Sequence, residues 1–119
     1  MNLLTIDAET TLNAPEAIGK AHPMFPGNFV VLLGTKLCTD EGSDVATSVS
    51  CYDRLGLPRL LMDLDSSMNL DFVVGCNLSF DLCYLYKEDK AFKTGLQRHR
   101  LWDIQLAEYL LSGQQDKWP

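Results

Sequence analysis

Residues 3–11 read LLTIDAETT, and this stretch decides how the chain is expected to fold. Residues 2–8 are rich in strand-forming side chains, and the run ends at two acids, Asp7 and Glu9, separated by one alanine. Residues two apart along a strand point to the same face, so the two carboxylates lie side by side and repel each other. The stretch therefore predicts a strand whose end is suited to bind a positively charged group.

Three strands with hairpin-like connections are predicted in the first half of the chain. After the first strand, residues 10–28 contain three of the five prolines and two glycines, which is typical of an ordered loop. Runs at 29–37 and 45–52 predict two more strands, with a turn at 39–44 between them. This order predicts an antiparallel meander.

Helices and short strands alternate in the second half. Helical spacing of leucines and short apolar runs predict a helix, a strand, a helix, a strand and a helix, at residues 55–67, 71–77, 78–89, 101–102 and 104–112. Gly113 is expected to stop the last helix. Such alternation favours right-handed parallel crossovers. We therefore predict a single α/β domain over residues 1–119, whose mixed sheet combines an antiparallel three-strand meander with β-α-β-α crossovers.

Composition and charge narrow the functional classes. The chain is 46% hydrophobic and 22% charged, the balance of an ordinary globular protein. It has no apolar run near the roughly 18 residues of a membrane span and no signal-peptide pattern, so we expect a cytoplasmic protein without membrane association. The net charge of −6 argues against broad binding of duplex nucleic acid, although divalent ions can hold a few phosphates at an acidic site.

The four cysteines indicate no metal site. None of them forms a close metal-ligand pair, and all lie in or beside apolar segments, at positions 38, 51, 76 and 83. We expect buried free thiols rather than a disulfide or a zinc site.

Acidic side chains are expected to meet at one edge of the sheet. If the first strand lies beside the strand at 71–77, their C-terminal ends share an edge, which is where open α/β sheets bind ligands. Asp7 and Glu9 end the first strand, whereas Asn77 ends the other and Asp81 follows one turn into the next helix. Three carboxylates without His or Cys suit Mg²⁺ or Mn²⁺, and a pair of such ions can promote hydrolysis of a phosphodiester.

Each of these residues also has a purely structural interpretation. Asp81 lies with Asn77 and Tyr84 on the face of the predicted helix away from its leucines, where it would be a solvated residue favoured by the helix dipole. An Asp-x-Glu pair at a strand end is by itself a weak signal. Thr10 would then simply start the loop, and Phe80 would be a core residue. Convergence of the three carboxylates is what favours a site.

Three segments resemble one known family. LLTIDAETT at 3–11 resembles the first exonuclease motif of the DEDD 3′–5′ exonucleases, in the form found in phage-type family A DNA polymerases. VVGCNLSFDLCYL at 73–85 resembles their second motif, and LWDIQLAEYLLSGQ at 101–114 is similar to the segment after it. The resemblance covers nearly the whole chain in order. It implies an RNase H-like fold and a metal-dependent exonuclease that removes nucleotides from the 3′ end of single-stranded DNA.

The resemblance assigns roles to individual residues. Asp7, Glu9 and Asp81 would be the catalytic carboxylates and metal ligands, with Asp7 bridging two Mg²⁺ or Mn²⁺ ions. The nucleic-acid-binding residues would be two threonines after the first motif and two residues of the second, namely Thr10, Thr11, Asn77 and Phe80.

The third motif of the family has no counterpart before residue 119. It would supply a fourth carboxylate, so the resemblance implies a C-terminally shortened fold in which the second ion is weakly held. His99 and Asp103 share the spacing of that motif, but we interpret Asp103 as the N-cap of the last helix. Asp116 is a second, remote candidate.

Three hypotheses follow from these patterns. The first is a small metal-dependent 3′–5′ exonuclease, located in the host cytoplasm if a phage encodes it. The second is a catalytically weak or inactive exonuclease-like module, which binds nucleic acid, docks on a DNA polymerase chain or forms a homodimer through an exposed apolar patch. The third is that the chain is a segment of a longer polymerase.

Overall fold

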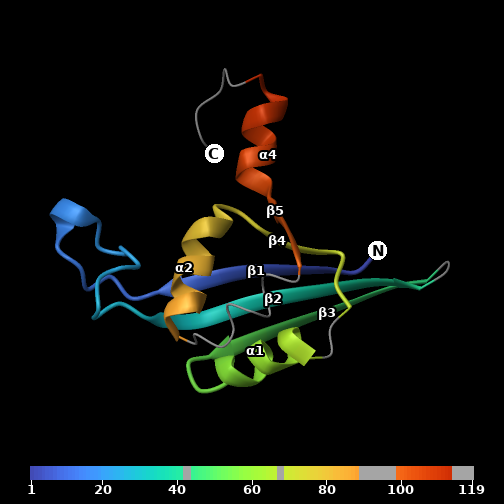
Figure 1. Cartoon of the computed structure of the whole chain (residues 1–119), viewed down its shortest axis with the longest axis horizontal. Coiled ribbons are helices and arrows are strands. Elements are labelled where there is room, and N and C mark those ends of the chain that lie inside the picture. Colours follow the sequence, from blue (N-terminus) through green and yellow to red (C-terminus); the bar gives the residue numbers. More distant parts are fainter. Residues whose placement is uncertain (42–43, 67–68, 89–98, 114–119) are drawn as a thin grey trace.

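The computed structural model describes residues 1–41, 44–66, 69–88 and 99–113 (Figure 1). Within these ranges the chain forms a five-stranded mixed sheet in the order β3-β2-β1-β4-β5. The strands are β1 (Leu3–Thr10), β2 (Val30–Glu41), β3 (Asp44–Asp53), β4 (Phe72–Gly75) and β5 (Arg100–Asp103).

The pairing directions confirm the predicted α/β arrangement. β1, β2 and β3 form an antiparallel meander, and β1, β4 and β5 pair in parallel. Strand β1 is central and carries the acidic motif at its C-terminal end. The C-terminal ends of β1 and β4 therefore share one edge of the sheet, as the sequence predicts.

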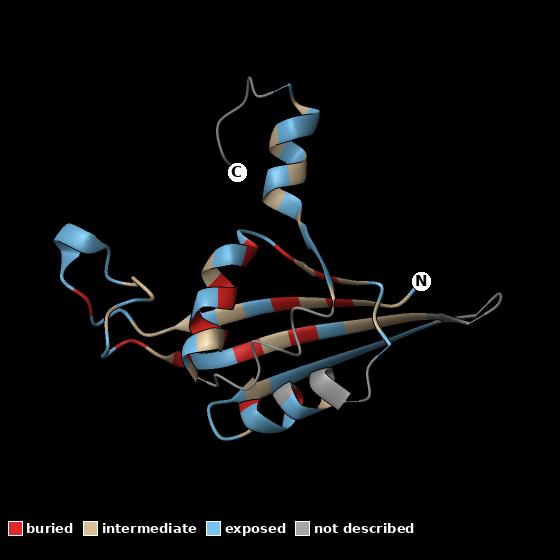
Figure 2. Ribbon diagram, viewed as in Figure 1, coloured by how far each residue is buried: buried red, intermediate tan, exposed pale blue. Residues whose placement is uncertain are grey.

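Two helices cover one face of the sheet. They are α1 (Leu57–Ser66) and α2 (Leu78–Glu88), and a 3-10 turn at Glu16–Ile18 lies in the loop after β1. Alternation along β1 turns Leu4 and Ile6 toward these helices, where they join one core cluster with leucines of α1 and α2. Figure 2 shows the buried residues gathered between the sheet and the helices. The shortest dimension of the molecule is 23 Å, which accommodates these two layers.

The last helix, α4 (Ile104–Leu111), stands clear of the sheet and buries none of its residues (Figures 1 and 2). Gly113 follows it with a positive φ of 71° and donates its N–H to the carbonyl of Leu110, so the predicted stop is confirmed. No helix in the described ranges is long and apolar enough to cross a membrane.

Two local expectations are wrong. The turn predicted at 39–44 is narrower, because β2 runs to Glu41 and β3 starts at Asp44. Cys51, Cys76 and Cys83 are exposed rather than buried, although all four cysteines are free thiols. Trp102 is half exposed, and it contacts the ring of Phe72 edge-to-face on the sheet face opposite α1 and α2.

Candidate functional site

Asp7 and Glu9 lie at the end of β1 on the sheet face away from the core. Both are exposed, whereas their neighbours Leu4 and Ile6 face the helices. The pairing with β2 becomes irregular between Glu9 and Thr10, where one residue of β2 is skipped. Such a bulge bends a strand and changes the direction of the side chains around it. The acidic pair thus sits where the regular ladder of β1 ends.

On its other edge, β1 loses its strand partner β4 earlier, after Thr5. Strand β4 pairs with β1 only as far as Thr5 and Val74. After Gly75 the chain turns into α2, and a Cβ at this glycine would lie 3.4 Å from the carbonyl oxygen of Ile6. The glycine therefore lets the turn approach β1 closely. Beyond that point β1 faces the first turn of α2.

Asp81 fills this gap from α2. It is only 4% exposed. The backbone amide of Ala8 in β1 lies near its carboxylate and acts to lower its pKa. Its Oδ2 atom is buried without a hydrogen-bond partner. Orphaned buried oxygens are rare in folded proteins and call for an explanation, such as an ion.

Burial and nearby charges raise the pKa of Asp81. Burial raises the pKa of Asp81 from 3.8 to about 7, and the charge of Asp7 adds to this effect. The backbone amide of Ala8 opposes it, and the charges of Asp103 and Glu9 raise the pKa further. The charges of Asp7 and Glu9 thus act on Asp81, but no three acids are grouped to hold an ion among the described residues, so convergence on a cation stays a prediction.

The structural alternative for Asp81, a solvated helix residue, is wrong. The face of α2 that carries Asp81 and Tyr84 is buried, because it packs against the end of β1 and the loop that follows. Tyr84 is fully buried, and its hydroxyl donates to the carbonyl of Ala21 at 2.6 Å. A polar helix face is buried here because its partners come from segments far away in the sequence, such as Ala21 for Tyr84.

A complete metal cluster is absent from the described residues, where no three His, Cys, Asp or Glu side chains are grouped to hold an ion. The three acids nevertheless fit a divalent cation in chemical type, since each offers carboxylate oxygens. Asp81 supplies a fixed, unsatisfied oxygen, whereas the exposed side chains of Asp7 and Glu9 are unconstrained by core packing.

The two threonines after the acidic motif have different surroundings. The Thr11 hydroxyl donates to Oδ1 of Asn28 at 2.9 Å and accepts the N–H of Phe29 at 3.0 Å. The Thr10 hydroxyl makes a long contact of 3.3 Å with the carbonyl of Thr11. Thr11 therefore holds the loop, and of the two Thr10 keeps more hydrogen-bonding capacity for a ligand.

Asn77 and Phe80 lie at the start of α2. Asn77 is exposed and adopts a positive φ of 52°, which asparagine tolerates better than most residues. Phe80 is half buried, and its ring contacts the ring of Tyr84 at a centroid distance of 5.2 Å. Asn77 is thus available to a ligand, whereas Phe80 is partly engaged in packing.

Asp103 caps two helices at once. Its carboxylate accepts the N–H groups of Gln105 and Leu106, so the predicted N-cap of α4 is confirmed. It also accepts the N–H groups of Asn77 and Leu78 at the start of α2, at 3.1 and 2.9 Å. These bonds occupy the Asp103 carboxylate with backbone N–H groups, which is the role of a helix cap. Asp116 lies outside the described residues.

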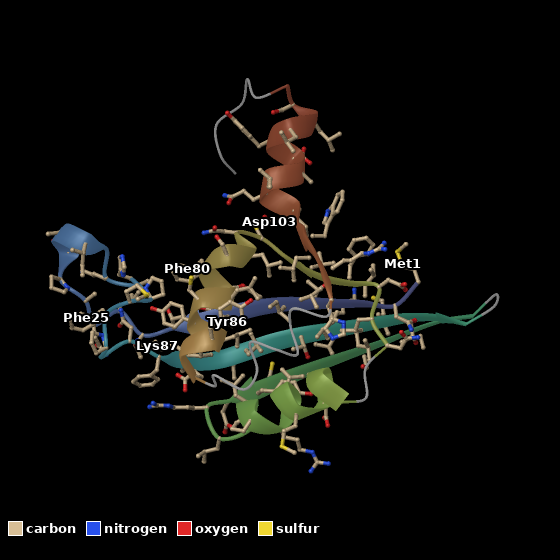
Figure 3. The ribbon with its side chains drawn as sticks, viewed as in Figure 1. Met1, Phe25, Phe80, Tyr86, Lys87 and Asp103 are labelled. Atoms are coloured by element: carbon tan, nitrogen blue, oxygen red, sulfur yellow. The ribbon has the colours of Figure 1, made fainter. Side chains whose placement is uncertain are left out.

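Sequence reasoning missed the residues that hold the loop at 11–28 against the site. Asn28 is 1% exposed, and its side chain bonds four groups of the loop. Lys87 of α2 donates to the carbonyls of Phe25 and Asn28, and Figure 3 shows Lys87 and Phe25 facing each other across this contact. No local sequence pattern marks such residues, because their hydrogen-bond partners lie between 6 and 62 residues away in the sequence.

A hollow of about 450 Å³ opens between this loop and α2. Its walls are mostly apolar and come from Pro23, Met24, Pro26, Cys83, Tyr86 and Lys87.

In comparisons with known proteins, no family model and no curated protein matches the chain.

Proposed function

We propose that the chain is a metal-dependent 3′–5′ exonuclease that hydrolyses the terminal phosphodiester of single-stranded DNA. One observation carries the proposal: Asp81 has a buried oxygen without a hydrogen-bond partner, and the charges of Asp7 and Glu9 raise the pKa of this carboxyl group. The acidic motifs that resemble those of the DEDD exonucleases supply exactly these residues in sequence order. A cation is the partner that relieves both the repulsion and the unsatisfied oxygen.

The three carboxylates would hold Mg²⁺ or Mn²⁺. When bound, such ions supply an activated water and stabilise the leaving oxygen of a phosphodiester. Asp81 would provide a fixed oxygen, and burial together with the charge of Asp7 raises its pKa to about 7. A bound cation would favour the deprotonated form of this carboxyl group. Asp7 and Glu9, which are exposed on β1, would be the further ligands that the resemblance implies.

The remaining assigned residues would orient the DNA end. Asn77 and Thr10 offer polar side chains at the two segments that flank the acids, and Phe80 presents part of its ring beside them. The loop is fixed to α2 by Lys87 and Tyr84, so this side of the site is preorganised. A chain with net charge −6 needs the cations to accept a phosphate at this rim.

The decisive experiment follows mononucleotide release from a 3′-labelled oligonucleotide in Mn²⁺ or Mg²⁺. We expect release by the wild type, with a loss of at least about a hundredfold in Asp7→Ala, because removal of a metal ligand misplaces the reacting groups. Glu16→Ala is the matched control, since Glu16 is an exposed acid in the loop rather than in the site. Equal release by wild type and Asp7→Ala would exclude the proposed chemistry.

A second function is favoured by a different observation. Large apolar side chains are exposed on β5 and α4, namely Leu101, Trp102, Ile104, Leu106, Leu110 and Leu111. A contiguous exposed apolar surface of this kind is typical of a protein interface. We therefore also propose that the chain acts as an exonuclease-like module that associates through α4, with a second copy or with a polymerase chain.

A further inference from the structure

Asp103 joins two segments that are far apart in the sequence. It is the last residue of β5, and it pairs with Gly75 at the end of β4. From there its carboxylate accepts Asn77 N–H and Leu78 N–H at the start of α2, and Gln105 N–H at 2.9 Å in α4. Figure 3 shows Asp103 next to the first turn of α2. The carboxylate thus caps the start of α2 from outside the helix.

The capped turn is the one that carries Asp81. Asp81 lies three residues after Leu78, so its position over β1 depends on where the helix starts. The start contains Asn77 in a left-handed conformation, which local sterics disfavour by about 1–2 kcal/mol for most residues and which needs support from its surroundings. Two hydrogen bonds to one carboxylate, from Asn77 N–H and Leu78 N–H, supply that support.

We propose that Asp103 is a positioning residue for the acidic site, which fixes the first turn of α2 and so holds the Asp81 carboxylate against the end of β1. The inference rests on the proposed function for its catalytic meaning but not for its geometry. Asp103 itself contacts neither substrate nor ions. Its effect passes through the backbone of α2 to the contact between Asp81 and the amide of Ala8.

The test measures this contact without any metal. In Asp103→Ala we expect the backbone amide of Ala8 to exchange its hydrogen at least about tenfold faster, under conditions in which circular dichroism shows a folded protein. Asp53→Ala is the matched control, because Asp53 accepts Gly56 N–H at 2.8 Å just before α1, far from Asp81 in the sheet order. Unchanged Ala8 exchange in Asp103→Ala, or equal acceleration in Asp53→Ala, would overturn the proposal.

A conservative variant separates positioning from a general loss of stability. Asp103→Asn keeps one acceptor oxygen, so Ala8 exchange should fall between wild type and Asp103→Ala. Mn²⁺ affinity, measured by electron paramagnetic resonance, should weaken about tenfold in Asp103→Ala and remain within twofold of wild type in Asp53→Ala. A wild type that binds no Mn²⁺ would defeat the proposed function, while Ala8 exchange would still decide the role of Asp103.

Discussion

A buried acid with a raised pKa makes the metal-free protein sensitive to pH. The pKa of Asp81 rises from 3.8 to about 7 on folding, mainly because burial disfavours its charge. Between these values the folded state keeps a proton that the unfolded state has released. The contribution of Asp81 to stability is therefore fully present below about pH 4 and is lost as the pH rises through 7.

Replacement of Asp81 by asparagine should remove this dependence. We expect Asp81→Asn to raise the free energy of unfolding of the metal-free protein at about pH 8 by about 2 kcal/mol, and to change it little near pH 4. Asparagine keeps an oxygen for the Ala8 amide and carries no charge. Urea unfolding at the two pH values measures the difference, and equal stabilities at pH 8 would show that the buried carboxylate carries no penalty.

Asn77 allows the backbone and side-chain roles of one residue to be separated. Glycine accepts the φ of 52° without strain, so Asn77→Gly should stay within about 0.5 kcal/mol of wild type, whereas Asn77→Val should lose about 2 kcal/mol. If the exposed amide binds DNA, Asn77→Gly should weaken oligonucleotide binding in fluorescence anisotropy despite its stability. Unaltered binding would limit Asn77 to its backbone role.

The loop between β1 and β2 is an element held by one buried side chain. Asn28 accepts at Oδ1 from Thr11 and Asn13, and donates through Nδ2 to the carbonyls of Lys20 and His22. Every hydrogen-bonding position of its amide is used. Asn28→Asp has the same shape, but it sets a carboxylate oxygen against two carbonyls.

We expect Asn28→Asp to lower the free energy of unfolding by about 3 kcal/mol, because a buried charge is left facing acceptors. Asn13→Asp is the matched control, since Asn13 is exposed and its side-chain amide donates to the carbonyl of Gly27. Asn13→Asp should lower the free energy of unfolding by only about 1 kcal/mol. Urea titrations of both variants measure the difference, and similar losses would indicate that the loop is anchored elsewhere.

At the scale of elements, the sequence predicted what depends on local pattern. Alternation in β1, the leucine spacing of α1 and the apolar run of β4 each specify their elements, and connection lengths then determine the strand directions. The shared edge of β1 and β4 followed from this order. Convergence of Asp81 with Asp7 and Glu9 on one cation stays a prediction from this order.

The environment of Asp81 was not predictable in the same way. Whether a polar helix face is solvated depends on what covers it, and the partners of Tyr84 and Lys87 lie about sixty residues earlier in the chain. The double cap by Asp103 has the same character, because only the first half of it is local. Long-range hydrogen bonds leave no periodic signal in a sequence.

At the scale of the whole molecule, the two faces of the sheet differ. One face is covered by α1 and α2, whereas the other presents a hollow of about 350 Å³ lined by Met1, Leu3, Phe72, Val74, Trp102 and Ile104. This surface continues into the exposed leucines of α4. Burial of such apolar area against a partner is favourable by about 25 cal/mol per Å² before the costs of association.

We expect the wild type to self-associate through this surface. In sedimentation velocity its weight-average mass should rise with concentration, whereas the double variant Leu106→Lys, Leu110→Lys should remain monomeric because charges oppose burial of the helix. Both leucines are about half exposed, at 49% and 55%, so the double variant should keep its stability. Met62→Lys, at a 68% exposed position on α1, is the matched control and should associate like wild type. A wild type that stays monomeric at every concentration would refute self-association, and the apolar face would then have to be covered by a different chain.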